Sequence, residues 1–292
     1  MTKILVVIDP TEEVHSGLER CKEISPNADV ELEVCLFIEN DSAKNLANSL
    51  REKREWLEAQ VKPYTAIGYK MTSEVRTFSR LYEAIIEAAV NGEVDLVFKP
   101  MRQHSLVRRV VVTSTDWNLI RFCPMPVLLV NGSQNVHGRP VVAAIDAVSD
   151  DDQHAELNDI VLQQAQRVAG VIDGQVACAN AWSIHPAVMA AGANDAVPLD
   201  IARDKHADHL KHATQLANQY NIPGDMVFVE EGSPQFVVNE TVKKVDAGVV
   251  VIGTVARSGV SGLFIGNTAE FLVEETTTDM LVVKAPDFEC PL

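Results

Sequence analysis

The sequence repeats itself once, and this repeat constrains the fold more than any other feature. The segment 4–9 is an apolar run that ends in an acid, Ile-Leu-Val-Val-Ile-Asp, and 141–146 repeats the pattern as Val-Val-Ala-Ala-Ile-Asp. Positions 95–130 also align without a gap with 248–283, and both stretches begin and end in a short apolar strand. Self-similarity on this scale predicts two related domains in tandem.

The second copy of the repeat is longer than the first. The numbering offset between the copies is 137 residues at the front and 153 at the back, so about sixteen residues are inserted. We expect them at the start of the first helix and in the apolar, Ala-rich stretch 185–198. A polar, glycine-bearing linker at 132–138 separates the halves. The sequence therefore predicts an N-terminal domain at 1–136 and a C-terminal domain at 138–292.

Within each half, short apolar strands alternate with amphipathic helices. In the first half we expect strands near 4–8, 32–38, 66–71, 95–99 and 127–130, with helices near 12–24, 42–61, 79–91 and 115–122. In the second half a helix is expected over 155–169, after the strand at 141–146. This alternation is typical of an α/β fold, a doubly wound parallel sheet of five strands with helices on both faces.

Charge and cysteine usage exclude several classes of protein. Lys and Arg number 25 and Asp and Glu 41, a formal charge of −16 that disfavours nucleic acid and membrane surfaces as partners. A nucleotide stays compatible with this charge, because backbone N–H groups can hold one phosphate locally. The five cysteines are dispersed, which indicates reduced thiols, and the first apolar run is too short for a signal peptide. We therefore expect a cytoplasmic protein.

One loop of the second half resembles a known signature. The stretch 253–270 follows a strand and opens a helix, and it resembles G-x2-G-x9-G-[S/T] of the universal stress protein family, the UspA superfamily. Here the four signature positions hold Gly253, Ala256, Gly266 and Asn267. The segment 115–127, Thr-Asp-Trp-Asn-Leu-Ile-Arg-Phe-Cys-Pro-Met-Pro-Val, resembles the tandem-domain members of that family. The resemblance covers the whole chain, once per half.

The resemblance implies a nucleotide site in the C-terminal half. In nucleotide-binding members this loop wraps the phosphates and ribose, since glycines and a helix N-terminus present N–H groups to an anion. Carried over by position, the site residues are Asp146, Ala181, Gly253, Ala256, Gly266, Asn267 and Thr268. Ala256 replaces a glycine and Asn267 replaces a hydroxyl residue. Two interpretations stay open: ATP or another adenine nucleotide binds here, or the loop is a tight turn that has given up its nucleotide.

The N-terminal half lacks the same signature. Its four matching positions hold Pro100, Gln103, Thr113 and Ser114, so every glycine is gone, and the proline removes a backbone donor. We expect no ATP binding of the family type in this half. The neighbouring segment 102–109 is locally basic and is either an anion or partner contact or a solvated loop.

The remaining candidates are weaker. His206, His209 and His212 either hold a surface metal or lie on a solvent-exposed helix face. No catalytic residue and no metal site is assigned, because P-loop, dinucleotide and serine-hydrolase motifs are absent from the sequence. The sequence favours a stress-response protein that acts by binding a ligand or partner. The alternatives are a carrier of an apolar small molecule beneath the stretch 187–198, or a slow ATP-hydrolysing enzyme.

The family resemblance also bears on assembly. Single-domain members pair through the strand that ends the domain, and this chain carries two such apolar strands, 127–130 and 280–283. Open apolar edges promote aggregation. We therefore expect these strands to pair antiparallel within one chain, as a pseudo-twofold internal dimer, and a homodimer of chains is a further option.

Overall fold

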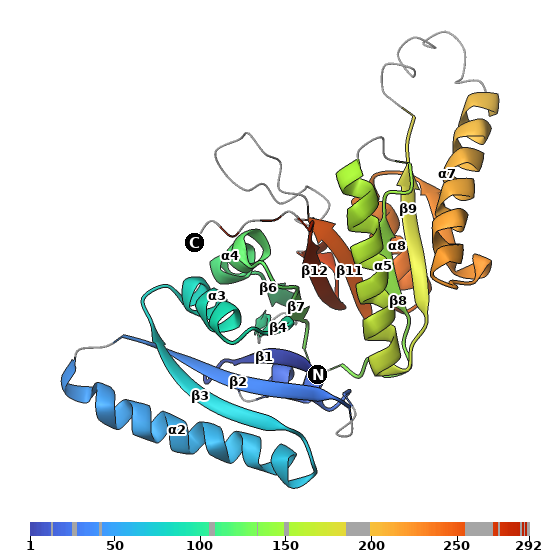
Figure 1. Ribbon diagram of the computed structural model, residues 1–292. Coiled ribbons are helices and arrows are strands. Elements are labelled where there is room, and N and C mark those ends of the chain that lie inside the picture. The colour runs from blue at the N-terminus through green and yellow to red at the C-terminus, as the bar shows by residue number, and fades with distance from the viewer. Residues whose placement is uncertain are drawn as a thin grey trace. The chain divides into compact units, whose positions relative to one another are not determined.

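The chain folds into two compact units, as the computed structural model in Figure 1 shows. Among the residues that the structure describes, the first unit contains Met1–Asn135 together with the segment from Asp279 onward, and the second contains Val136 to Thr254 and 271–278. The described residues are 1–12, 14–24, 28–40, 43–104, 109–132, 134–148, 152–184, 199–254, 271–273, 275–286, 288 and 290.

The first unit is a doubly wound α/β layer. Its elements are β1 (Thr2–Ile8), α1 (Ser16–Cys21), β2 (Val30–Glu39), α2 (Ala43–Ala66), β3 (Met71–Phe78), α3 (Leu81–Asn91), β4 (Leu96–Pro100), β5 (Arg102–His104), β6 (Arg109–Val111), α4 (Ser114–Phe122), β7 (Val127–Val130) and β12 (Asp279–Lys284). The strand order is β12-β7-β4-β1-β2-β3, and all neighbours are parallel except β12 and β7. Helix α2 lies on one side of this sheet, and α3 with α4 on the other (Figure 1).

The second unit repeats the pattern. Its described elements are β8 (Val141–Ile145), α5 (Asp152–Ile172), β9 (Val176–Trp182), α7 (Leu199–Gln219), the 3-10 turn η1 (Gly224–Met226), β10 (Val227–Glu231), α8 (Pro234–Lys244) and β11 (Val249–Thr254). The strands are parallel in the order β10-β9-β8-β11. Helices α5 and α8 lie on opposite sides of them (Figure 1). The tandem α/β fold expected from the repeat is confirmed.

One strand prediction was wrong. Of the strand expected near 66–71, Ala66 ends α2, 67–70 form the connection that follows, and Met71 begins β3, which occupies Met71–Phe78. Among the described strands β3 pairs with β2 alone, so it is an edge strand, and within β3 only Val75 is buried. An edge strand with one solvent-exposed side needs few apolar residues, so a search for continuous apolar runs does not detect it.

The two apolar edge strands of the repeat pair as the sequence predicted. Met280 lies opposite Leu129 and Val282 opposite Val127, antiparallel. Because β12 pairs with β7, it groups with the first unit, although it follows the second half in sequence. The compact units thus differ at β12 from the predicted domains 1–136 and 138–292, which stay a prediction, as does the pseudo-twofold relation between the halves.

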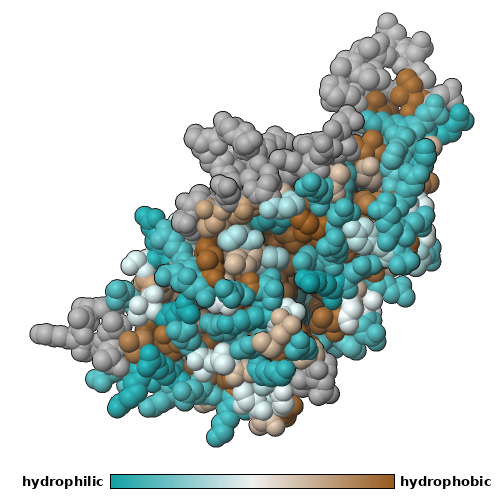
Figure 2. Space-filling view, in the orientation of Figure 1, coloured by the Kyte–Doolittle hydropathy of each residue, from teal (hydrophilic) through white to brown (hydrophobic). Residues whose placement is uncertain are grey.

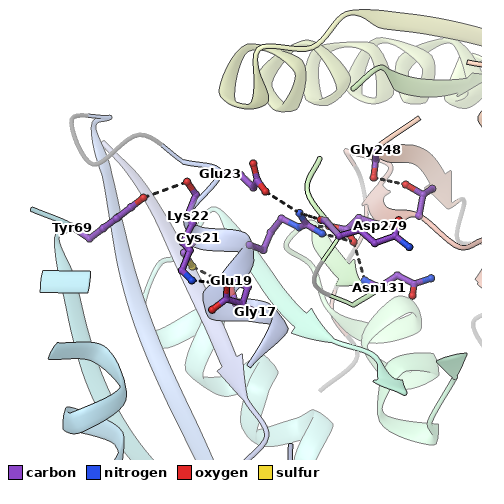
Figure 3. A network of polar contacts seen from close by, with 12 residues as sticks. Gly17, Glu19, Cys21, Lys22, Glu23, Tyr69, Asn131, Gly248 and Asp279 are labelled. Carbon is purple, nitrogen blue, oxygen red and sulfur yellow. Dashed lines mark hydrogen bonds and ion pairs between the residues drawn. The ribbon is translucent and has the colours of Figure 1, made fainter. Parts of the chain in front are cut away.

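A buried ion pair fixes the first residue of β12 (Figure 3). Asp279 is 1% exposed, and its carboxylate lies 2.6 Å from Nε and accepts a hydrogen bond of 3.2 Å from Nη2 of Arg20, in α1. The backbone N–H of Asn131 donates to the same carboxylate at 2.9 Å. Burial raises the pKa of Asp279 to about 6, although Arg20 and the Asn131 N–H oppose the shift. This cluster, Arg20 with Asp279 and Asn131, is called the strand anchor below.

No helix within the described ranges combines the length and apolar character that a membrane span requires.

Candidate functional site

The turn after β8 carries the acid that the repeat singled out, Asp146. Asn158 of α5 holds the backbone of this residue from both sides: its Oδ1 accepts from the Asp146 N–H at 2.9 Å, and its Nδ2 donates to the Asp146 carbonyl at 2.7 Å. Asn158 is buried, whereas Asp146 is exposed. The position of Asp146 is therefore set by the packing of α5 on the sheet.

The next residue of this turn is held from the neighbouring strand. The N–H of Ala147 donates to Oδ1 of Asn180 in β9 at 2.8 Å, and Asn180 is fully buried. Nδ2 of Asn180 lies 3.1 Å from Nδ1 of His209 in α7. Two asparagines from different elements thus fix consecutive backbone groups of one turn at the carboxyl end of the parallel strands. Crevices at this edge are the usual ligand sites of open α/β sheets.

The three histidines of α7 do not share one surface. Hydrophilic residues predominate on the exposed side of the helix (Figure 2), but His209 is only 7% exposed, so the expectation of an exposed face was wrong for this residue. His206 lies against the Trp182 ring at 5.8 Å between centroids, and Nδ1 of His212 lies 3.3 Å from the Asp208 carboxylate. Among the described residues, these histidines form no group with metal-binding geometry.

A different trio, Glu33, Cys35 and Glu74, does bring its side-chain ligand atoms together. Its two carboxylates are already paired, Glu33 with Lys3 at 2.9 Å and Glu74 with Arg76 at 2.7 Å. Burial raises the pKa of the Cys35 thiol to about 12, so the sulfur keeps its proton at neutral pH. These ion pairs account for the group without a metal.

Gly253, the first glycine of the signature, lies in β11 where α5 packs against this strand. A Cβ added at this position would lie 2.5 Å from Cγ of Leu157. The glycine is therefore required by helix–strand packing at the start of the motif, whatever the loop binds. Ala181 lies in β9 opposite Glu230. Ala256, Gly266, Asn267 and Thr268 lie outside the described residues.

The packing of Gly253 can be tested directly. Gly253→Ala is expected to lower the free energy of unfolding by about 1–3 kcal/mol, because the new methyl group overpacks against Leu157. Adding Leu157→Ala should recover most of that loss relative to the Leu157→Ala single variant. Urea unfolding of the four proteins measures this. Additive effects of the two changes would show that the glycine is needed for another reason.

The matching positions of the first half are occupied by the protein itself. Asp9, the counterpart of Asp146, accepts from the Thr11 N–H at 2.9 Å and the Thr11 hydroxyl at 2.6 Å, and lies 3.3 Å from Nε of Arg102. Burial alone would raise the pKa of Asp9, but Thr11 and Arg102 together hold it below its ordinary value. Arg102 belongs to β5, which pairs antiparallel with β6, so parts of the expected basic loop 102–109 lie in strands.

The helix that follows in the first half is capped by its own residues. Thr113 and Asp116 form a capping box: the Asp116 N–H donates to the Thr113 hydroxyl, and the Thr113 N–H donates to the Asp116 carboxylate at 2.7 Å. The other carboxylate oxygen lies 3.1 Å from Nζ of Lys99, and both side chains are buried. N–H groups that a phosphate would need are thus already engaged.

Comparison with known proteins agrees with this architecture. A model of the universal stress protein family matches residues 1–131 and again residues 139–284. The chain belongs to the universal stress protein family. The two matches cover both copies of the repeat, so this universal stress protein is a tandem of two family domains.

Relatives of similar length share this organisation. Universal stress protein E of Escherichia coli K12 is 29% identical over 313 residues, covering 99% of this chain and 96% of that protein. A homolog of universal stress protein E from Haemophilus influenzae is 27% identical, covering 96% of each. A solved structure of a protein of unknown function from Pseudomonas aeruginosa PAO1 has a TM-score of 0.76 at 25% identity, covering 98% of this chain and 93% of that one.

Sequence reasoning found Asp146 and named His209 as a candidate, but it missed Asn158, Asn180 and the contacts that join these residues to the turn. Asn158, Asn180 and His209 come from three elements, and no motif links them along the chain. The one available signal was Asn180 itself, a polar residue in an otherwise apolar strand, Val-Ala-Cys-Ala-Asn-Ala-Trp. A fully buried amide must find hydrogen-bond partners, so its presence there predicts a polar network nearby.

Proposed function

We propose that this universal stress protein is a ligand-binding protein of the stress response that takes one adenine nucleotide per chain, in its C-terminal half. The phosphates bind along the backbone of the signature segment that begins at Gly253, and Asp146 lies beside the sugar. The protein acts through the bound and unbound states of this site.

The observation that carries this proposal is that the matching positions of the first half are already occupied. In the first half the acid after β1 is closed off by Thr11 and Arg102, and the helix N-terminus is closed by Thr113 and Asp116. A ligand there would have to displace hydrogen bonds and an ion pair that the fold already makes. These contacts support a site in the C-terminal half alone.

Features of the second half fit a small anionic ligand. Asp146 is exposed, and two buried asparagines fix the turn that carries it, so little order is lost when a ligand docks. The charge of −16 demands that anion binding be local. Backbone N–H groups at a helix start supply such local binding without any lysine or arginine.

Calorimetric titration with ATP tests the proposal. We expect a stoichiometry of one per chain, and loss of detectable binding in Gly266→Val, because a β-branched side chain would enter the space that the phosphates need. The matched change in the first half, Thr113→Val, should leave binding unchanged, although loss of the cap costs about 1 kcal/mol of stability.

Three results would contradict the proposed site. A stoichiometry of two would show that the first half also binds, and unchanged binding in Gly266→Val would place the ligand elsewhere. Absence of binding in the unmodified protein would favour the alternative in which Ala256 and Asn267 mark a loop without a nucleotide. Mass spectrometry of natively purified protein would then separate an apolar ligand from a protein partner.

A further inference from the structure

The contact between Asn180 and His209 determines which protonation state of the histidine the fold accepts. The Ala147 N–H can only donate, and its partner on Asn180 must therefore be the carbonyl oxygen Oδ1, at 2.8 Å. This fixes the amide orientation, so the group facing Nδ1 of His209 at 3.1 Å is the NH2 group, a donor. Nδ1 must then be an acceptor. His209 is accordingly neutral, with its proton on Nε2.

Protonation of His209 conflicts with this arrangement. A second N–H on the ring at Nδ1 would point at the NH2 group of Asn180, so two donors would face each other in a buried place. Turning the amide over would relieve the conflict at His209, but it would place NH2 against the Ala147 N–H. If the amide stays as it is, the hydrogen bond between Asn180 and His209 is lost, and if it turns over, the hydrogen bond from Ala147 that holds the turn after β8 is lost.

We propose that His209 is a proton switch for the C-terminal site: when the histidine takes up a proton, the turn that carries Asp146 and Ala147 is released and ligand binding weakens. This inference rests on the proposed nucleotide site, which the turn helps to build. A fall in pH would thus weaken ligand binding at that site.

The surroundings of His209 favour the neutral form at neutral pH. Burial lowers the pKa of His209, Lys205 and His212 lower it further, and Asp146 and Asp208 oppose the shift. The contact from β9 is the uncharged amide of Asn180. The charged residues of the other elements that pack on α7 are exposed, namely Glu230, Glu231 and Asp225.

The sign of the effect follows from the direction of this shift. With the pKa of His209 below its ordinary value of 6.5, the unfolded or released state binds the proton more readily than the folded one. The contribution of His209 to stability is therefore present above pH 6.5 and is lost as the pH falls below it.

Histidine-selective NMR of the full chain, without ligand, tests the switch. We expect the Nε2–H tautomer at pH 7.5, and an Ala147 amide resonance that shifts with the same midpoint as His209, below 6.5. In Asn180→Asp the carboxylate can accept from both Ala147 and a protonated His209. That variant should move the His209 midpoint above 6.5 and keep the Ala147 resonance in place on acidification. An Nδ1–H tautomer, or an Ala147 resonance that ignores the titration of His209, overturns the proposal.

Calorimetry links the switch to the ligand. ATP affinity should weaken about fivefold or more between pH 7.5 and 5.5. His209→Gln, which cannot titrate, should lose most of this change, and His212→Gln, a half-buried position on the same helix, should keep it. An equal pH effect in the unmodified protein and His209→Gln refutes the switch but leaves the nucleotide site intact. Absence of ATP binding at both pH values refutes the proposed function and the effect of His209 on ligand binding. The NMR experiment still tests whether protonation of His209 releases the turn.

Discussion

Replacing Asp279 by alanine is expected to lower the free energy of unfolding by about 3–5 kcal/mol. Asp279 is 1% exposed and Arg20 is 5% exposed, so the change removes the closer of two counter-charges from a buried guanidinium and leaves it Glu23 at 3.6 Å. It also removes the acceptor of the Asn131 N–H. Urea unfolding followed by circular dichroism measures the loss.

A double variant separates the ion pair from the packing around it. Arg20→Met with Asp279→Leu replaces both charges of the strand anchor by apolar groups, and this exchange is often close to neutral for buried pairs. We expect the double variant to be more stable than Asp279→Ala. A cost below 1 kcal/mol for Asp279→Ala alone would show that water reaches Arg20 and that the pair contributes little.

Asp116→Ala is expected to have an effect of similar size, about 3 kcal/mol or more. This one carboxylate accepts from Thr113 in the capping box of α4 and pairs with the buried ammonium of Lys99. The substitution therefore removes a hydrogen-bond acceptor from Thr113 and a counter-charge from Lys99. Thermal unfolding of three variants resolves the contributions. Thr113→Val loses only the cap, at about 1 kcal/mol, and Asp116→Asn keeps an acceptor for the cap but loses the charge.

The order of these three variants is the decisive result. Asp116→Ala should be the least stable, with Asp116→Asn between it and Thr113→Val. If Asp116→Asn is as stable as the unmodified protein, the ion pair with Lys99 is dispensable, and Asp116 stabilises α4 through the capping box alone.

The repeat and the apolar runs were sufficient to predict most of the sheet. The strands expected at 4–8, 32–38, 95–99 and 127–130 are present as β1, β2, β4 and β7, with β4 one residue later than expected. Both faces of a parallel sheet are covered, which demands continuous apolar sequence. The antiparallel pairing of β7 with β12 followed from the same property at an edge. Strand β3 was not predicted because an edge strand carries polar residues. The pair of strands β5 and β6 was not predicted because its residues have no strand-like pattern.

The candidate site was less predictable than the fold. Asp146 could be found because it ends an apolar run in both copies of the repeat. His209 was expected on an exposed helix face, since spacing along a helix does not reveal which side the sheet covers. Its burial beside Asn180 depends on how α7 packs against β9, and that is decided by tertiary contacts rather than by local sequence.

The pairing of β12 with β7 has a consequence for the synthesis of the protein on the ribosome. Asp279 leaves the ribosome 148 residues after Asn131, its backbone partner in the strand anchor. Until then β7 is an apolar edge with no neighbour on one side, the kind of strand that recruits other chains. Chains arrested during synthesis after the first half would keep that edge open. Synthesis of β12 is thus a condition for covering this edge, so chains that lack β12 expose an apolar strand that chaperones and proteases can recognise.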